Sequence, residues 1–154
     1  MIDYQAIKST IIGHIKTNTG HEVVLQASNA PQPAYPFCSY TITSPYLPVS
    51  HAEVGQDIVE DVEMVFSLTW HSQSATEAQG LAHQTAMFFK MRNARQWLGD
   101  SGITVVRLEG FQNRDTFLTI DSERRVGLDV RFRIRHIETQ PEFENIESVI
   151  VPEI

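Results

Sequence analysis

The most regular hydrophobic pattern in the chain runs from Leu128 to Ile137, where apolar and charged residues alternate. The apolar positions are Leu128, Val130, Phe132 and Ile134, and the charged positions are Asp129, Arg131, Arg133 and Arg135. Because successive side chains of a strand point to opposite faces, this alternation predicts a half-buried β-strand whose outer face carries three arginines about 7 Å apart. Like charges at this spacing need an acidic counterpart, either on neighbouring strands of the same subunit or on a partner.

A second long alternation covers residues 59–71 and predicts the strand that pairs with the first. Its apolar positions are Val62, Met64, Phe66, Leu68 and Trp70. Two long half-buried strands favour an antiparallel pair at the centre of a sheet. In such a pair Glu63, on the polar face, is one candidate to neutralise the arginines.

Helical spacing of apolar residues predicts two main helices. The first covers residues 3–20, with an aspartate as N-cap and a glycine as C-cap. The second opens with a capping-box sequence and covers residues 74–91, with its apolar stripe facing the sheet. A short helical piece over residues 94–98 is expected to place Trp97 and Leu98 in the core.

Shorter strands are predicted where β-branched and aromatic residues cluster between turn-forming residues. They cover residues 22–27, 37–44, 103–108 and 116–120, with turns at 110–115 and 121–127. Residues 45–57 contain two prolines and a glycine and are predicted to form a loop. The apolar residues of this loop, Tyr46, Leu47 and Val49, favour a contact surface over a plain connection.

These elements predict one α+β domain over residues 1–137: a single mostly antiparallel β-sheet with two main helices packed on one face, and an extended loop. Residues 138–154 combine five glutamates with several apolar residues. They are expected to form an acidic C-terminal arm that lies on this subunit or on a neighbour.

Composition narrows the classes of function. A net charge of −7 argues against general affinity for nucleic acid. The single cysteine, Cys38, excludes an internal disulfide and indicates a reducing compartment. The chain has no apolar run of the ~20 residues that span a bilayer and no signal-peptide pattern, so we expect synthesis in the cytoplasm and no membrane partner.

Catalytic, cofactor and metal motifs are absent from the sequence. The six histidines are scattered, and no phosphate-binding glycine loop or nucleophile elbow is present. Acidic residues 121, 123 and 129 beside Arg124 and Arg125 are compatible with a carboxylate pair and a phosphate clamp, but we favour a turn with a mixed-charge surface. Residues 113–115 are expected to be a turn whose Asn and Asp side chains bind their own backbone. We therefore expect no cofactor, no metal and no enzymatic reaction.

Two C-terminal motifs resemble a known family. They are the turn Asn113-Arg-Asp-Thr116 and the strand Glu123-Arg-Arg-Val-Gly-Leu-Asp-Val130. An opening Asp-Tyr-x-x-Ile helix, a Pro-x-Pro-x-Tyr-Pro approach to a strand and a Tyr-Thr-Ile-Thr-Ser-Pro strand end occur upstream. Together they resemble the neck (tail) terminator family of tailed bacteriophages over residues 2–137, whereas residues after 138 match no pattern of that family.

The resemblance implies a virion subunit of a six-fold ring at the head–tail junction, assembled in the host cytoplasm. Such a ring ends the tail tube and docks the head through its connector or adaptor, with the tube and a sheath as further partners. DNA passes through the ring only as cargo, and an acidic lumen wall suits that passage because it repels DNA.

We therefore expect the candidate functional residues to form subunit or partner interfaces. They are Arg131, Arg133, Arg135, Arg114, Arg124, Arg125, Tyr46, Leu47 and Val49. Charge reversal at Arg133 should then impair assembly and leave the fold intact, unless the arginine pairs within its own subunit. Two alternatives remain: a small-ligand module that uses the helix-free sheet face, and a single-stranded nucleic-acid binder that uses the arginines with Tyr40 or Trp70.

Overall fold

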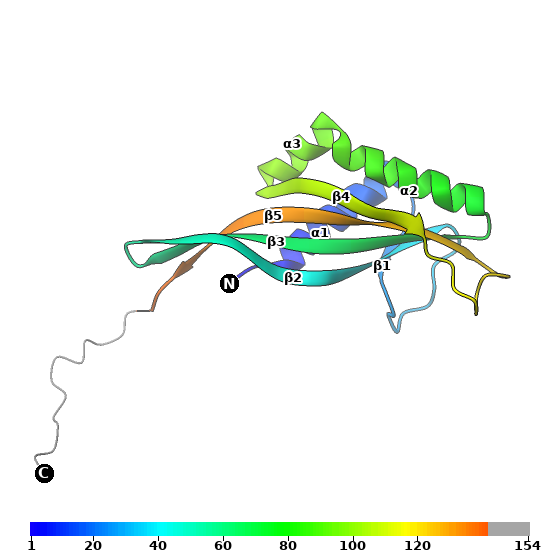
Figure 1. The fold of residues 1–154 in the computed structure, drawn as a ribbon, viewed down its shortest axis with the longest axis horizontal. Helices are drawn as coiled ribbons and strands as arrows, with labels where there is room; N and C mark the ends of the chain where they lie inside the picture. The colour runs from blue at the N-terminus through cyan, green and yellow to red at the C-terminus, as the bar shows by residue number, and fades with distance from the viewer. Residues whose placement is uncertain (142–154) are drawn as a thin grey trace, which may run out of the picture.

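The computed structural model of the chain describes residues 1–141. Three helices and five strands follow one another along these residues (Figure 1). In chain order they are α1 (Tyr4–Thr19), β1 (Val23–Leu25), β2 (Phe37–Val54), β3 (Asp57–Ser72), α2 (Ala75–Lys90), α3 (Arg92–Asp100), β4 (Ile103–Asn113) and β5 (Arg124–Thr139).

All five strands form one sheet in the order β1-β2-β3-β5-β4. Only the β1–β2 pair is parallel, and the other three pairs are antiparallel. The predicted central pair is confirmed, because β3 and β5 stay in register from Asp57↔Thr139 to Ser72↔Arg124. The α+β class and the mostly antiparallel single sheet are confirmed as well.

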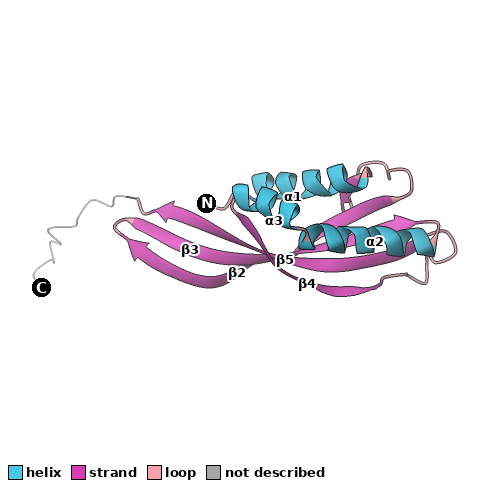
Figure 2. Cartoon of the chain, turned by 90° about the horizontal axis from the view of Figure 1, so that it is seen from above, coloured by secondary structure: helices cyan, strands magenta, loops and turns pink. Residues whose placement is uncertain are grey.

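The helices lie together on one face of the sheet and leave the other face uncovered (Figure 2). The apolar alternations of β3 and β5 point to the helices, and every side chain of the two predicted apolar rows is buried. The α2 stripe, from Ala78 to Phe89, closes the core from the other side. Predicted caps are confirmed: Asp3 accepts from Ala6 N at 3.0 Å and Ser74 from Glu77 N at 3.3 Å.

The loop predicted over residues 45–57 is wrong, because β2 and β3 continue through it as a long hairpin. Among residues 1–141, β2 has no outer partner beyond the Leu25↔Tyr40 pair, and prolines are found in edge strands of this kind. Register shifts between Ile42 and Ser50 absorb the irregular backbone. The hairpin extends past the helices together with the end of β5 (Figures 1 and 2). We call residues 45–61 and 135–139 the arm; this is a different feature from the C-terminal arm predicted over residues 138–154.

The segment around residues 103–127 also differs from the prediction. β4 continues through the expected turn to Asn113, β5 begins at Arg124 within the second expected turn, and the strand expected at 116–120 is a tight turn. Thr116 O accepts from both Thr119 N (3.2 Å) and Ile120 N (3.0 Å), a helical-type bonding pattern that overrides the β-branched composition. We call residues 116–120 the finger.

Two smaller expectations concern α3. The helix begins at Arg92 rather than 94, and Leu98 is buried as expected. Trp97 is half-exposed instead of lying in the core, and its ring stacks on His14 of α1 at 5.9 Å.

The C-terminal arm predicted over residues 138–154 lies outside the described residues from residue 142 onward.

Candidate functional site

The helix-free sheet face carries the arginine row, and acidic residues of the same subunit neutralise it. Glu63 on β3 accepts from Arg131 Nη1 at 3.3 Å and from Arg133 Nε at 3.0 Å. The other pairs of the row are Arg131–Glu109 at 3.5 Å and Arg135–Asp61 at 2.8 Å. The hydrogen bonds from Arg133 and then Arg131 lower the pKa of Glu63, although partial burial opposes them.

The expected role of Glu63 is therefore confirmed, and the acidic counterpart lies within the subunit. Arg133 is part of the β3–β5 pairing, so its charge reversal places two carboxylates side by side and should weaken the fold itself. Use of the row as an interface with another subunit remains a prediction.

Arg114 lies across β5 and ties three segments of the fold together. Its Nη1 donates to Ser67 Oγ (2.7 Å) and Thr69 Oγ1 (3.0 Å), and its Nη2 donates to Asp129 Oδ1 (3.0 Å). A methyl group at Gly127 would lie 2.6 Å from Arg114 Nη1 and closer still to the carbonyl oxygen of Leu68. Glycine at 127 therefore makes room for the guanidinium, and Arg114 serves the sheet rather than the outer surface.

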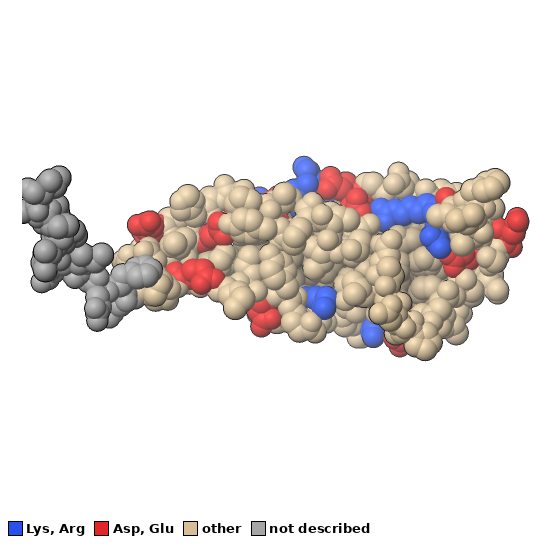
Figure 3. All heavy atoms as spheres, turned by 90° about the horizontal axis from the view of Figure 1, so that it is seen from below, with Lys and Arg blue, Asp and Glu red and all other residues tan. Residues whose placement is uncertain are grey.

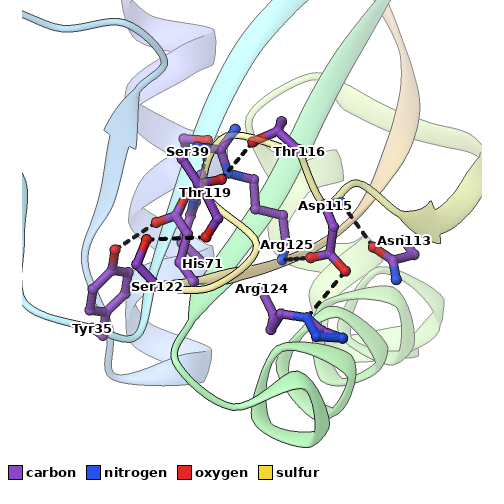
Figure 4. Close-up of polar contacts among 11 residues, drawn as sticks. Tyr35, Ser39, His71, Asn113, Asp115, Thr116, Thr119, Ser122, Arg124 and Arg125 are labelled. Atoms are coloured by element: carbon purple, nitrogen blue, oxygen red, sulfur yellow. Dashed lines mark hydrogen bonds and ion pairs between the residues drawn. The ribbon is translucent and has the colours of Figure 1, made fainter.

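Asp115 fastens the other side of the same turn (Figure 4). Its Oδ1 accepts from the backbone N–H of Arg125 at 2.7 Å, and its Oδ2 accepts from Arg124 Nε at 3.3 Å. Asn113 Oδ1 accepts from the Asp115 N–H at 2.9 Å, as expected of a turn of this kind. The two motifs quoted above thus form a single unit, and we call the contacts between residues 113–116 and 123–129 the motif lock.

Glu123 is the buried hub at the end of the motif lock. It accepts from Tyr35 Oη at 2.6 Å and from Arg125 Nε at 2.5 Å, and its Oε1 lies 3.3 Å from His71 Nδ1. Burial alone would raise the pKa of Glu123, but the hydrogen bonds from Tyr35, Arg125 and His71 lower it. The carboxylate is therefore charged at neutral pH.

His71 lies between Glu123 and Ser39, in the order of a hydrolase triad. Burial lowers the pKa of His71, so the ring is neutral, donates from Nδ1 to Glu123 and accepts from Ser39 Oγ at Nε2 (2.8 Å). Ser39 sits inside a ladder paired on both sides, with Val24 and Thr69. The sheet therefore occupies the backbone that an oxyanion hole beside Ser39 would need, and the geometry is that of a structural brace.

A cavity of about 650 Å³ opens above this network. Its floor is polar, and its wall, formed by β1, the β1–β2 connection and the start of β2, mixes apolar and polar side chains. The floor comprises Ser39, Ser67, Thr69, His71, Arg114, Glu123 and Arg125, and the wall comprises Val24, Leu25, Ala27, Ala30, Pro31, Pro33 and Phe37 together with Gln26, Ser28 and Gln32. We call it the sheet-end pocket.

The arm is the second exposed feature, at the opposite end of the sheet. Its residues, 45–61 and 135–139, contain five acidic residues, and Arg135 is the one Lys or Arg among them. Viewed from below, the left end of the molecule accordingly shows red atoms without blue ones (Figure 3). Tyr46 donates to Glu60 Oε2 at 2.6 Å, Leu47 pairs with Glu63, and Val49 is half-exposed at a register shift. Apolar and acidic side chains are thus mixed on a surface that no described helix covers.

Sequence reasoning missed three parts of this site. It did not bring Tyr35, Ser39 and His71 to Glu123, because those contacts join residues 32 to 88 positions apart. It missed the Arg114–Asp129 pair, although the glycine between two charged residues of the strand was a usable signal. It also placed Phe117 and Leu118 in a strand, whereas both project from the finger into solvent.

Comparison with known proteins identifies the family. The family model described as phage neck terminator protein matches residues 4–154, almost the whole chain. The chain belongs to the phage neck terminator family. No curated protein matches the sequence. A chain of a solved structure titled "Virion of native gene transfer agent (GTA) particle" is similar at 15% identity and a TM-score of 0.42, covering 86% of this chain and 91% of that chain.

Neck terminators are structural phage proteins, so this chain is a component of the virion neck. Among residues 1–141, no three His, Cys, Asp or Glu side chains are grouped so as to hold a metal ion. No helix of this terminator within the same residues is both long and apolar enough to cross a bilayer.

Proposed function

We propose that this terminator assembles into a hexameric ring. The ring ends the tail tube and joins the tail to the head connector or adaptor. Family membership over residues 4–154 carries the proposal. The ring passes DNA through its lumen, forms in the host cytoplasm and catalyses no reaction.

The distribution of charge supports a role in which DNA slides past the protein. The chain has a net charge of −7, and the arginines of the sheet face are bound to carboxylates of the same subunit. An acidic surface repels the phosphate backbone, whereas a binding surface would need unpaired cations. The arm carries five acidic residues against one arginine, and we assign it to the lumen side of the ring.

The exposed apolar residues of the arm support contacts with other neck or tail proteins. Ala52, Val59 and Ile137 are direct neighbours across three strands, and Val54 lies beside them. Val54 and Ile137 are more than half-exposed. An apolar row on an uncovered sheet favours a protein partner, for which the tube end, the sheath and the connector are the candidates.

Tube growth tests this function directly. Purified tail-tube protein is polymerised with and without the terminator, and tube lengths are measured by electron microscopy. We expect the terminator to sit at one tube end as a ring and to stop elongation there. Tubes of unchanged length with bare ends would contradict the proposal.

A further inference from the structure

The finger presents two large apolar side chains to solvent at the end of the sheet away from the arm. Phe117 is 95% exposed and Leu118 is 93% exposed. Neither side chain lines the sheet-end pocket of its own chain, although Arg114 and Glu123, which flank the finger in sequence, do. Adjacent side chains exposed to this degree, at the tip of a turn, are typical of a contact site.

The finger is held in one conformation before any partner arrives. Thr119 O accepts from Ser122 N (2.9 Å) and Glu123 N (2.8 Å), which adds to the bonds that converge on Thr116 O. The motif lock fixes both ends of the turn to β5. A preorganised finger loses little conformational entropy on binding, which favours a role as an anchor.

The sheet-end pocket has the complementary character. The charged groups of its floor are already engaged in hydrogen bonds: Arg114 with Asp129, and Glu123 with Tyr35, Arg125 and His71. A charged ligand would have to break these bonds, whereas apolar side chains can pack against the leucine, alanine and proline side chains of the wall, beside Gln26, Ser28 and Gln32. The pocket can therefore take apolar side chains without disturbing its floor.

We propose that Phe117 and Leu118 of each subunit insert into the sheet-end pocket of the next subunit around the ring. This inference rests on the proposed ring. A cyclic ring needs a heterologous contact, in which two different surfaces of the same chain meet, and the finger and pocket form such a pair. A phenylalanine side chain buries roughly 150–250 Å², against about 800 Å² per partner in a standard interface. The finger is thus an anchor, and other surfaces complete the contact.

Cysteine cross-linking tests the contact, because the one native cysteine, Cys38, is fully buried. Leu118→Cys and Ala30→Cys chains, of different mass, are mixed and assembled with or without tail tubes, then oxidised mildly. We expect mixed disulfide dimers to be at least ten times more abundant than the disulfide homodimers that either variant forms alone. Gln79→Cys, at an exposed position of α2, replaces Ala30→Cys in the matched control and should give only background.

The outcomes separate the finger from the ring. In one outcome, rings form but Leu118→Cys cross-links to Ala30→Cys no more than it cross-links to Gln79→Cys. That result would overturn the finger contact and leave the proposed ring unaffected. Leu118→Cys chains that link to one another would overturn it too, because the contact would then be isologous. Failure to form rings under either condition would reject the proposed function itself.

A second variant measures how much the finger contributes to assembly. Phe117→Ser/Leu118→Ser changes only exposed side chains, so the thermal midpoint of the monomer should stay unchanged. The concentration at which half the chains enter rings should rise at least ten-fold. An unchanged assembly midpoint would contradict the anchor role.

Discussion

At the scale of single residues, the sequence motifs of this chain are explained by the hydrogen bonds and packing contacts that they make within the fold. Residue 127 is a glycine because the Arg114 guanidinium occupies the space that a side chain would need. Asp129, two residues further along β5, accepts a hydrogen bond from the same guanidinium. The alternations of β3 and β5 made Glu63 one candidate to neutralise the arginines, and Arg131 and Arg133 do pair with it. The lock around Arg114 was not predicted, because it joins a turn to strands through contacts 15 to 47 residues apart in sequence, and Gly127 was its one local signal.

Gly127→Ala tests the space that Arg114 occupies. The added methyl group meets the guanidinium and a backbone carbonyl, so the free energy of unfolding should fall by roughly 1–3 kcal/mol. Thermal melts report the loss. Gly80→Ala is the control, because the helical position 80 is exposed with nothing within 4 Å, and alanine there should be stabilising by roughly 0.5–1 kcal/mol. Equal stability of the two variants would argue against the lock.

The pH dependence of stability tests the His71 brace. Burial lowers the pKa of His71 below its usual 6.5, so the unfolded chain takes up a proton first as the pH falls. This part of the stability is complete well above pH 6.5 and should decline as the pH falls through 6.5 toward the lower pKa of the folded state. Denaturant unfolding should show that His71→Gln is less stable at pH 7.5 but loses less on acidification. His83→Gln, at a surface position on α2, should retain the full decline.

At the scale of elements, the long hairpin is the main departure from the prediction. Prolines and a glycine indicated a loop at 45–57, but β2 is an edge strand there and tolerates them. Alternation predicted β3 and β5 well because both are half-buried along most of their length. The arm follows a weaker pattern because the described helices reach only its base, where Tyr4 Oη of α1 donates to the carbonyl oxygen of Pro45.

Glu63→Gln measures how much the ion pairs between β3 and β5 contribute to the free energy of unfolding. Glu63 serves two guanidinium groups and is mostly buried, so its neutralisation should lower the free energy of unfolding by roughly 1–3 kcal/mol. Denaturant unfolding at low and high salt gives the value. Glu53→Gln, on the exposed arm, is the control and should change stability by no more than about 0.5 kcal/mol. Comparable effects of the two substitutions would contradict the pairing.

Val54→Asp tests the arm as a docking surface. The side chain is exposed, so the melting temperature should be unchanged while tube termination or head joining is lost. Tube length and head–tail joining, scored by electron microscopy, give the readout. Thr76→Asp, at an exposed position on α2, is the control and should terminate tubes normally. Normal termination by Val54→Asp would remove the arm from the contact surfaces.

At the scale of the whole molecule, the helices, the acidic arm and the finger divide the surface into regions of different character. The fold class was predictable because layer architecture follows from periodicity. The positions of the pocket and the finger were not, because both depend on how connections pack over the end of the sheet. A terminator needs surfaces for its own copies and for other proteins, and the finger and arm lie at opposite ends of the sheet.

The central claim is that the chain assembles into a closed ring, and mass in solution tests it most directly. Light scattering after size exclusion, over a concentration series with and without tail tubes, gives the number of subunits. We expect a single assembly of about six times the 17.5 kDa chain mass, in equilibrium with monomer or formed on the tube. A chain that stays monomeric at every concentration and fails to form rings on tubes would contradict the account.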